Sequence, residues 1–335
     1  MKINLFLSVV FLFFLTGCID ISFDSAIKEM VSVNGAGDIA LCIDNKIYIT
    51  DLGKAVFRKV VDNNTEISSV AWCDKGLVFA EKIEGGRSAL NIFKDGTIST
   101  VMEEADSICH ISSSGDKISY VVSAETCGSF GDLYIYELST AKSFLLAKRV
   151  YYDYKWLPDG GSVMVIIPKN DSAEGNFEGV LSIVDIDDWS ENVIYEGGFR
   201  KDEDFFDFIN KNSIILSSEG KIYKCDLSSK KISLWYGPTG YDFKVPFSRN
   251  SCLGGCVVGK PVNSGEDWSK GLSLVTIDGK IEPIEGMPLW TNGKSVVYLD
   301  EQGESLCSME FGTKKIVVIY CEKESAEGLK AEEKL

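Results

Sequence analysis

Short runs that alternate apolar and polar residues recur along most of the chain after its first thirty residues. The clearest copy is the stretch Tyr154 to Tyr195, and helical periodicity of any length is absent from the repeating part. Alternation with a period of two, bounded by Gly, Pro and Asp, predicts strands joined by turns. The expected strands of this copy are the run ending at Trp156, Val163 to Ile167, Val180 to Ile186, and Asn192 to Glu196, with a tight turn through Pro158, Asp159, Gly160 and Gly161 between the first two.

The third of these strands has the most visible repeats. Seven copies begin at spacings of 43, 43, 48, 41, 50 and 34 residues, which fits a constant core with loops of variable length. The copies are Ile47 to Leu52, Leu90 to Phe93, Leu133 to Leu138, Leu181 to Ile186, Ile222 to Leu227, Leu272 to Val275, and Leu306 to Met309. Four strands per roughly forty residues is typical of one β-propeller blade. The sequence therefore predicts an all-β fold, a propeller of seven four-stranded blades, with six or eight as the alternatives.

The first strand of each expected blade carries an aromatic-like residue before a turn and an apolar strand. These residues are Trp72, His110, Trp156, Phe208, Phe247 and Trp290, while the first copy, Val33 to Ile43, lacks one. A closed ring leaves no exposed sheet ends between its first and last blades. We therefore expect an N-terminal strand, Ile19 to Phe23 or Met30 to Val33, to complete the last blade.

The first eighteen residues form a separate pattern. Lys2 supplies a positive charge, Leu5 to Leu15 is almost unbroken apolar sequence, and Leu15-Thr16-Gly17-Cys18 closes it. Such a run is short for a membrane span and favours a signal peptide. The closing tetrapeptide resembles the bacterial lipobox, which implies cleavage before Cys18 and acylation of that residue. An ordinary secretory peptide, with a coincidental cysteine, is the alternative.

The lipobox-like sequence and the repeats together predict four regions. Residues 1–17 are the signal peptide, 18–32 a lipidated linker, 33–321 the propeller and 322–335 a charged tail. The expected location is the cell envelope, lipid-anchored, periplasmic or facing the surface. No Asp follows Cys18, since Ile19 occupies that position, which implies the outer membrane if the cell is Gram-negative. We expect a monomeric propeller.

A second resemblance concerns the repeat itself. The turn Leu157 to Gly161 after Trp156 looks like the Ser-Pro-Asp-Gly-Lys signature of TolB-type, WD40-like propeller repeats, with weaker echoes at Ser114 to Lys117 and Asn292 to Lys294. It covers roughly Val33 to Tyr320. The N-terminal domain of TolB has no counterpart between Cys18 and the first repeat, so this resemblance implies the fold and not a Tol-Pal role.

Charge and cysteine content narrow the function further. A formal net charge of -16, from 50 acidic and 34 basic residues, argues against binding nucleic acid, which depends on cationic side chains. Nine cysteines follow Cys18, an odd number that leaves at least one unpaired in an oxidising compartment. Most of them fall inside expected strands and are interpreted as core residues. Cys252 and Cys256 could bridge a loop.

Binding residues are expected on the longer loops. Insertions fall between the second and third strands, at Glu84 to Ser88, Ser123 to Gly131, Pro168 to Gly179 and Gly259 to Lys270, whereas turns of the opposite face are expected to be uniformly tight. Enlarged loops on one face of a rigid scaffold are typical of a binding surface. Candidate contacts are Phe130, Asp171, Glu174, Phe177 and Trp268 from these loops, and Tyr151, Tyr152, Arg200, Asp202, Asp204, Trp235 and Tyr241 from blade-to-blade connections. The alternative is that these residues pack between blades or lie on solvated loops.

Catalytic and metal motifs are not found. A Ser-His-Asp triad would need His110, the only histidine, which is interpreted as a packing residue, and we expect no cofactor or metal site. The acidic runs Asp185 to Asp188 and Lys201 to Asp204 are interpreted as solvated charge. We therefore expect a non-enzymatic platform that binds an envelope protein or a cell-surface glycan. The alternative is a hydrolase or lyase acting on a polysaccharide or peptide with paired carboxylates in the central funnel.

Overall fold

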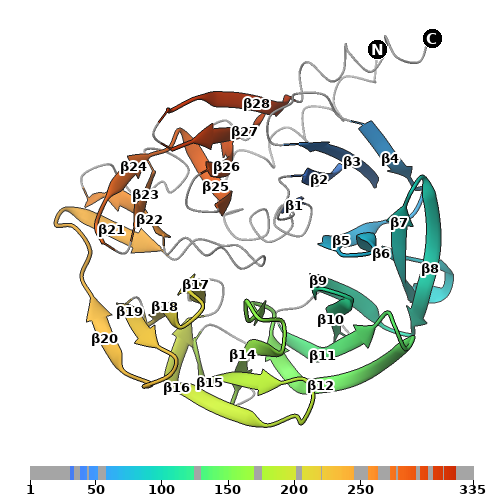
Figure 1. Cartoon of the computed structure of the whole chain (residues 1–335), viewed down its shortest axis with the longest axis horizontal. Coiled ribbons are helices and arrows are strands. Elements are labelled where there is room, and N and C mark those ends of the chain that lie inside the picture. Colours follow the sequence, from blue (N-terminus) through green and yellow to red (C-terminus); the bar gives the residue numbers. More distant parts are fainter. Residues whose placement is uncertain are drawn as a thin grey trace, which may run out of the picture.

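The structure is a ring of separate sheets around a central axis (Figure 1). It is a computed structural model that describes residues 31–33, 38–43, 45–51, 58–123, 130–169, 176–200, 206–219, 221–244, 256–262, 272–276, 278–291, 295–300, 305–311 and 313–321. Within these residues there are seven four-stranded antiparallel sheets and no α-helix, and a single 3-10 turn at Glu84–Gly86. This arrangement confirms the predicted seven-bladed β-propeller.

Each blade consists of four strands that follow one another in the chain. In Figure 1 the first strands, such as β5, β9 and β17, face the centre and the fourth strands, such as β8, β12 and β20, form the rim. Blade 1 comprises β1 (Val31–Val33), β2 (Asp38–Ile43), β3 (Lys46–Asp51) and β4 (Arg58–Asp62), and blade 2 comprises β5 (Ile67–Cys73), β6 (Gly76–Lys82), β7 (Ser88–Lys94) and β8 (Thr97–Glu104). Blade 3 comprises β9 (Ser107–Ser114), β10 (Lys117–Ser123), β11 (Phe130–Glu137) and β12 (Lys142–Tyr151).

The remaining blades have the same strand order. Blade 4 comprises β13 (Lys155–Trp156), β14 (Ser162–Pro168), β15 (Asn176–Asp185) and β16 (Glu191–Arg200), and blade 5 comprises β17 (Phe206–Asn210), β18 (Ser213–Ser218), β19 (Lys221–Asp226) and β20 (Ile232–Trp235). Blade 6 comprises β21 (Tyr241–Lys244), β22 (Cys256–Pro261), β23 (Ser273–Thr276) and β24 (Ile281–Pro283), and blade 7 comprises β25 (Gly286–Thr291), β26 (Ser295–Asp300), β27 (Ser305–Glu310) and β28 (Ile316–Cys321). Every copy of the repeat recognised in the sequence overlaps the third strand of a blade.

Three expectations about the strands are wrong. β1 pairs with β2 of its own blade, so Met30 to Val33 does not complete the last blade, whose four strands all come from residues 286–321; Ile19 to Phe23 lies outside the described residues. His110 does not share the position of Trp72 and Trp156: Trp72 pairs with Leu77 and Trp156 with Val163, but the corresponding partner of Ile118 is Ser113. The first strand of blade 6 is β21, before Phe247, which the structure does not describe.

Hydrophobic clusters lie at the seams between blades. Each seam from blade 1 through blade 7 in sequence order has one, formed where apolar side chains of one sheet meet those of the next. The seam between blades 1 and 2 includes Ile47 and Phe79, for example, and that between blades 6 and 7 includes Leu274 and Tyr298. Because a lone four-stranded sheet leaves both faces open to water, these seams supply the burial that makes each blade stable.

Serine hydroxyl groups also form hydrogen bonds between neighbouring blades. Ser32 Oγ of β1 accepts a hydrogen bond from the Trp72 N–H of β5 at 3.3 Å, and Ser69 Oγ of β5 accepts one from the Ile111 N–H of β9 at 3.1 Å. Trp156 Nε1 of β13 donates to Ser119 Oγ of β10 at 2.8 Å. Buried backbone N–H groups near the axis therefore find partners across the seams.

The connections divide between the two faces of the ring. Links between second and third strands share one face with the blade-to-blade links; we call this the loop face. Residues 124–129, 169–175 and 262–272 belong to it, as predicted. The opposite face is not uniformly tight, however, because residues 52–57 join β3 to β4 and residues 245–255 join β21 to β22.

Candidate functional site

Several predicted binding residues lie at strand ends on the loop face. Phe130 begins β11, Tyr151 ends β12, Phe177 is the second residue of β15 and Arg200 ends β16. These positions bring aromatic residues from blades 3 and 4 to one seam. We call Phe130, Tyr151, Tyr152, Phe177 and Phe199 the aromatic cluster.

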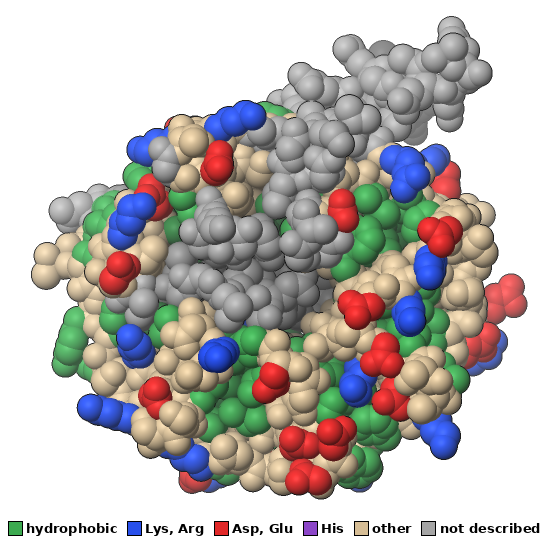
Figure 2. Space-filling model, in the orientation of Figure 1, with side chains coloured by type: hydrophobic (Ala, Val, Ile, Leu, Met, Phe, Trp, Pro, Cys, Tyr) green, Lys and Arg blue, Asp and Glu red, His purple; other side chains and the backbone are tan. Residues whose placement is uncertain are grey.

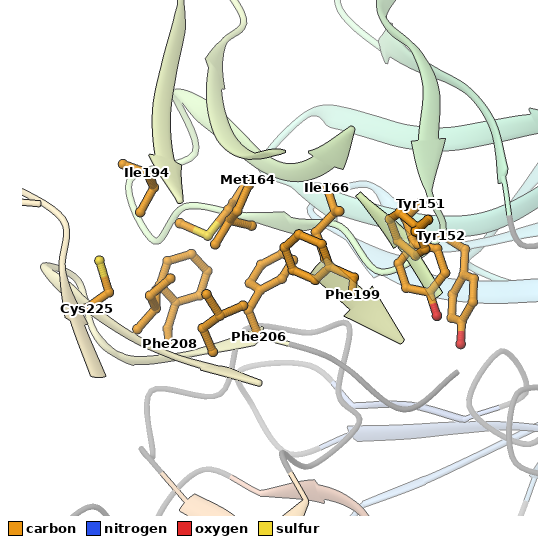
Figure 3. Close-up of a cluster of buried hydrophobic side chains, with 13 residues drawn as sticks. Tyr151, Tyr152, Met164, Ile166, Ile194, Phe199, Phe206, Phe208 and Cys225 are labelled. Carbon is orange, nitrogen blue, oxygen red and sulfur yellow. The ribbon is translucent and has the colours of Figure 1, made fainter. Parts of the chain in front are cut away.

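The rings of the aromatic cluster contact one another directly. The Phe130 centroid lies 5.6 Å from that of Tyr151 and 5.4 Å from that of Phe177, and Tyr151 lies 4.4 Å from Tyr152. Figure 3 shows the cluster continuing into blade 5, where Phe206 and Phe208 follow Phe199. Such tilted and offset ring pairs stabilise a seam beyond the area that they bury.

Burial separates the members of the cluster. Tyr151, Tyr152 and Phe177 are buried, with exposed fractions of 0%, 7% and 3%, whereas Phe130 is only half-buried. The Arg149 guanidinium carbon lies 5.7 Å from the centroid of the Phe130 ring. The three buried rings therefore pack between blades in this structure, and Phe130 with Arg149 forms the part of the cluster that reaches the surface.

The other predicted residues are spread around the ring. Trp235 packs at the seam between blades 5 and 6, against the cluster of Ile215, Ile222 and Val275, and is half-buried, as is Tyr241 at the start of β21. Arg200 is half-buried at the end of β16. Trp235 and Tyr241 belong to blades 5 and 6, away from the aromatic cluster, whereas Arg200 follows Phe199 in β16 and pairs with Asn176, the residue before Phe177 in β15. Asp171, Glu174, Asp202, Asp204, Trp268 and Cys18, the residue predicted to be lipidated, lie outside the described residues.

The most unusual polar group near the axis was missed by the sequence analysis. Lys155 of β13 and Asp207 of β17 form an ion pair across the seam of blades 4 and 5, with 3.2 Å between Nζ and Oδ1 and side-chain exposures of 1% and 5%. Asp153 is also buried nearby. In the sequence Lys155 and Asp207 stand in strand-like runs beside Trp156 and Phe208, but which partner each one meets depends on how the blades pack.

Burial and charge act in opposite directions on this carboxyl group. Removal from water raises the pKa of Asp207 to about 6, although the Lys155 charge and the Phe208 N–H, which donates to Oδ1 at 2.7 Å, favour the ionised form. The Lys155 ammonium also lies 5.9 Å from the Phe206 ring centroid. An ammonium group beside one of two buried carboxyl groups differs from an open carboxylate pair, the arrangement that hydrolysis of a glycan requires.

His110 and the acidic turn at Asp185 to Asp188 make packing contacts and hydrogen bonds within the fold. The His110 ring is buried and stacks on Tyr152 with 5.2 Å between centroids, and the backbone there has a φ of 54° at an irregularity of β9. In the turn after β15, Asp185 Oδ1 accepts hydrogen bonds from the N–H groups of Asp187 and Asp188 at 2.8 and 3.2 Å. Asp185 therefore holds its own turn.

The cysteines differ in state. Cys42, Cys73, Cys225 and Cys307 are thiols, whereas Cys109, which is buried in β9 as expected of a core residue, is disulfide-bonded. Burial raises the pKa of the Cys73 and Cys225 thiols, which keeps them protonated and unreactive. Among the described residues, no group of His, Cys, Asp and Glu side chains is arranged to hold a metal ion, and no helix is long and apolar enough to span a bilayer.

Comparisons with known proteins concern the fold. The chain is similar to the β-propeller domain of the Trilobed protease from Pyrococcus furiosus, with a TM-score of 0.59 and 15% identity over 87% of this chain and 96% of that domain. It is also similar to a prolyl endopeptidase, with a TM-score of 0.58 and 12% identity over 88% of this chain and 50% of that one. TolB from Acinetobacter baumannii aligns with a TM-score of 0.44 and 19% identity, over 72% of this chain and 60% of TolB.

No protein-family model matches the sequence, and no curated protein matches it. The chain spans 60% of the TolB structure and half of the endopeptidase, so it matches only part of each. At identities of 12% and 15% the two stronger likenesses bear on architecture and not on activity. The chain is a seven-bladed β-propeller.

Proposed function

We propose that this protein is a lipid-anchored component of the bacterial cell envelope whose propeller binds an envelope protein or a surface glycan through its loop face. The anchor is Cys18, within the lipobox-like sequence Leu15-Thr16-Gly17-Cys18. The disulfide bond of Cys109 supports export, because disulfides persist in oxidising compartments and are rare in the cytosol.

The observation that carries the binding role is the presence of three enlarged connections between second and third strands, all on the loop face. They are residues 124–129, 169–175 and 262–272, and they join strands whose seams are packed by continuous hydrophobic clusters. A rigid ring with long connections suits recognition, since the scaffold fixes the positions at which loops of variable sequence begin and end. Phe130 and Arg149 contribute a surface-reaching aromatic and cationic pair at the foot of two of these loops.

Site-specific photo-crosslinking in cells tests the loop face. A photoreactive amino acid at Trp268 or Asp171 is expected to capture a partner, whereas the same group at Ile98, which is 44% exposed on the outer strand of blade 2, is not. A glycan partner would appear instead as retention on an immobilised cell-wall fraction that is lost when the Trp268 loop is shortened. Equal capture from Ile98 and Trp268, with no retention on glycans, would contradict the proposal.

The anchor has its own test. Cells fed an alkyne fatty acid are expected to label the wild-type chain and not the Cys18→Ala variant, and the intact mass of the mature protein is expected to begin at Cys18 with acyl chains attached. A mature chain without acyl groups would remove the anchor and leave the binding role to be judged by crosslinking alone.

A further inference from the structure

An exposed tryptophan lies on the rim of the ring, away from the loop face. Trp189, in the turn between β15 and β16, is 56% exposed, and its ring stacks on Phe144 of β12 in the neighbouring blade, with 5.8 Å between centroids and an interplanar angle of 14°. Stacking covers one face of the indole and fixes its orientation. The remaining exposed surface is a rigid aromatic area, which costs little entropy to bury against a partner.

The fold does not require an indole at this position. The same turn recurs in blades 5 and 7, where the N–H groups of Asp226 and Glu310 donate to the carbonyls of Lys231 and Lys315, as Asp185 N–H does to Ser190. The residue before each acceptor has a positive φ, which is 63° at Trp189, 54° at Lys230 and 55° at Lys314. Solvated lysines therefore form this turn, and a bulky side chain with left-handed backbone is uncommon and points to a function.

Acidic side chains surround the indole. Asp187, Asp188 and Glu191 are all exposed within two residues of Trp189, and Figure 2 shows acidic side chains gathered on the rim over β15 and β16. Hydrogen bonds from Ser190 hold the pKa of Asp188 below its usual range, so this group stays ionised. The nearest opposing charge in the sequence of β12 is Lys142, two residues before Phe144. These three exposed carboxylates favour a cationic ligand over an anionic one.

We propose that Trp189 and the carboxylates of Asp187, Asp188 and Glu191 form a docking site for a basic peptide segment of a partner protein. A Lys or Arg side chain of the peptide lies on the open face of the indole, where the ring attracts a cation, and the carboxylates neutralise its charge. Val193, 42% exposed and on the same side of β16 as Glu191, offers apolar contact to the next peptide residue. This rim site is separate from the loop face and does not depend on the function proposed for it.

The test is a titration of the full-length protein labelled with 5-fluorotryptophan. The probe is acetyl-Lys-Arg-Lys-Arg-amide, and the readout is the fluorine resonance of Trp189, identified by its absence in Trp189→Ala. We expect saturable shifts, an affinity that falls as salt rises, and a loss of about fivefold in the double variant Asp187→Asn, Asp188→Asn, which keeps the oxygen that accepts the turn hydrogen bond. Isothermal titration calorimetry with Trp189→Ala is expected to show a similar loss.

Matched controls separate this site from general attraction to an acidic protein. Tyr236→Ala removes an aromatic residue that is 80% exposed elsewhere, and Asp95→Asn removes an exposed charge in the tight turn of blade 2; neither is expected to change the affinity. The proposal is overturned if the peptide leaves the Trp189 resonance unmoved, if the controls weaken binding as much as the site variants do, or if chitotriose shifts the resonance and the peptide does not.

Discussion

A buried lysine and a buried aspartate at the centre of a protein are costly unless each has a partner. Lys155 and Asp207 meet this condition by pairing with each other across the seam of blades 4 and 5. Each residue comes from the inner strand of its blade, so the ion pair forms only when the two blades pack in the alignment seen here. Replacing one partner leaves a charge without compensation, and the destabilisation that follows is larger than the contribution of the pair itself.

We therefore expect Lys155→Met to lower the free energy of unfolding by about 3–5 kcal/mol at pH 7, because the Asp207 carboxylate is left buried without its counter-charge. Urea denaturation followed by tryptophan fluorescence measures this loss. The double variant Lys155→Met, Asp207→Leu is expected to recover much of the stability. A double variant no more stable than Lys155→Met would show that the charge is not the cause.

The same carboxyl group predicts a dependence on pH. The folded-state pKa of Asp207, about 6, lies above the value near 3.9 of an unfolded Asp, so the folded protein holds this proton more tightly. The resulting stabilisation is fully present below about pH 4 and is lost as the pH rises through 6. The unfolding free energy of the wild type, measured relative to that of Asp207→Asn, is therefore expected to fall from pH 4 to pH 7. A difference that is constant across this range would contradict the shift.

At the scale of elements, the inner strands depend on hydrogen bonds that cross blade boundaries. We expect Ser69→Ala to destabilise the protein by about 1–3 kcal/mol, since the buried Ile111 N–H loses its acceptor. The matched control is Ser99→Ala on the outer strand β8, where the serine is exposed and the change is expected to stay within about 0.5 kcal/mol. Thermal unfolding distinguishes them, and equal effects would remove the role given to Ser69.

The pairing of β10 with β11 imposes a second constraint. A Cβ added at Gly131 would lie 2.6 Å from the Val122 carbonyl oxygen and 2.4 Å from Val121 Cγ1, so the strand backbone would have to move. We expect Gly131→Ala to cost about 1–3 kcal/mol. Gly161→Ala is the control, because its nearest neighbour is Asp159 Oδ1 at 3.8 Å. Chemical denaturation of the two variants side by side checks the contrast, and an equal effect of both changes would show that β11 can move to accept the added methyl group.

At the scale of the whole molecule, the described strands do not include the shared last blade that the sequence analysis expected from Met30 to Val33. Every described strand belongs to a blade built from consecutive strands, and none of them crosses from one end of the chain to the sheet at the other end. Within the described residues, the seam between blades 7 and 1 therefore lacks a shared backbone ladder. Side-chain packing resists opening less than a continuous sheet does, since it contributes no cooperative set of backbone hydrogen bonds.

We expect hydrogen exchange to begin at this seam. Native-state exchange followed by mass spectrometry should show faster exchange in β1 and β28 than in β10 and β14, which lie between the large clusters of blades 2 to 5. Strand length also favours β10 and β14. Protection of β1 and β28 equal to that of the middle blades would contradict an open seam.

The sequence by itself determined the repeat. Alternation with a period of two is a local property, because each residue's face in a strand is set by its immediate neighbours, and so the third strands and the number of blades were predicted correctly. The sequence also located the loop face, because the distance between successive expected strands gives the length of the loop that joins them. It misplaced the first strand of blade 6 because Phe247 is aromatic like the matching residues of the sister blades, whereas that strand, β21, spans Tyr241–Lys244.

Only the tertiary structure decided which residues meet across seams. Tyr151 and Phe177 were predicted as contacts for a partner because aromatic residues at loop ends resemble a binding surface, but the packing of blades 3 and 4 buries them. The pairing of Lys155 with Asp207 and the stacking of Trp189 on Phe144 join residues more than forty positions apart in each case. Such contacts depend on the angle between neighbouring sheets, and no local pattern in the sequence records that angle.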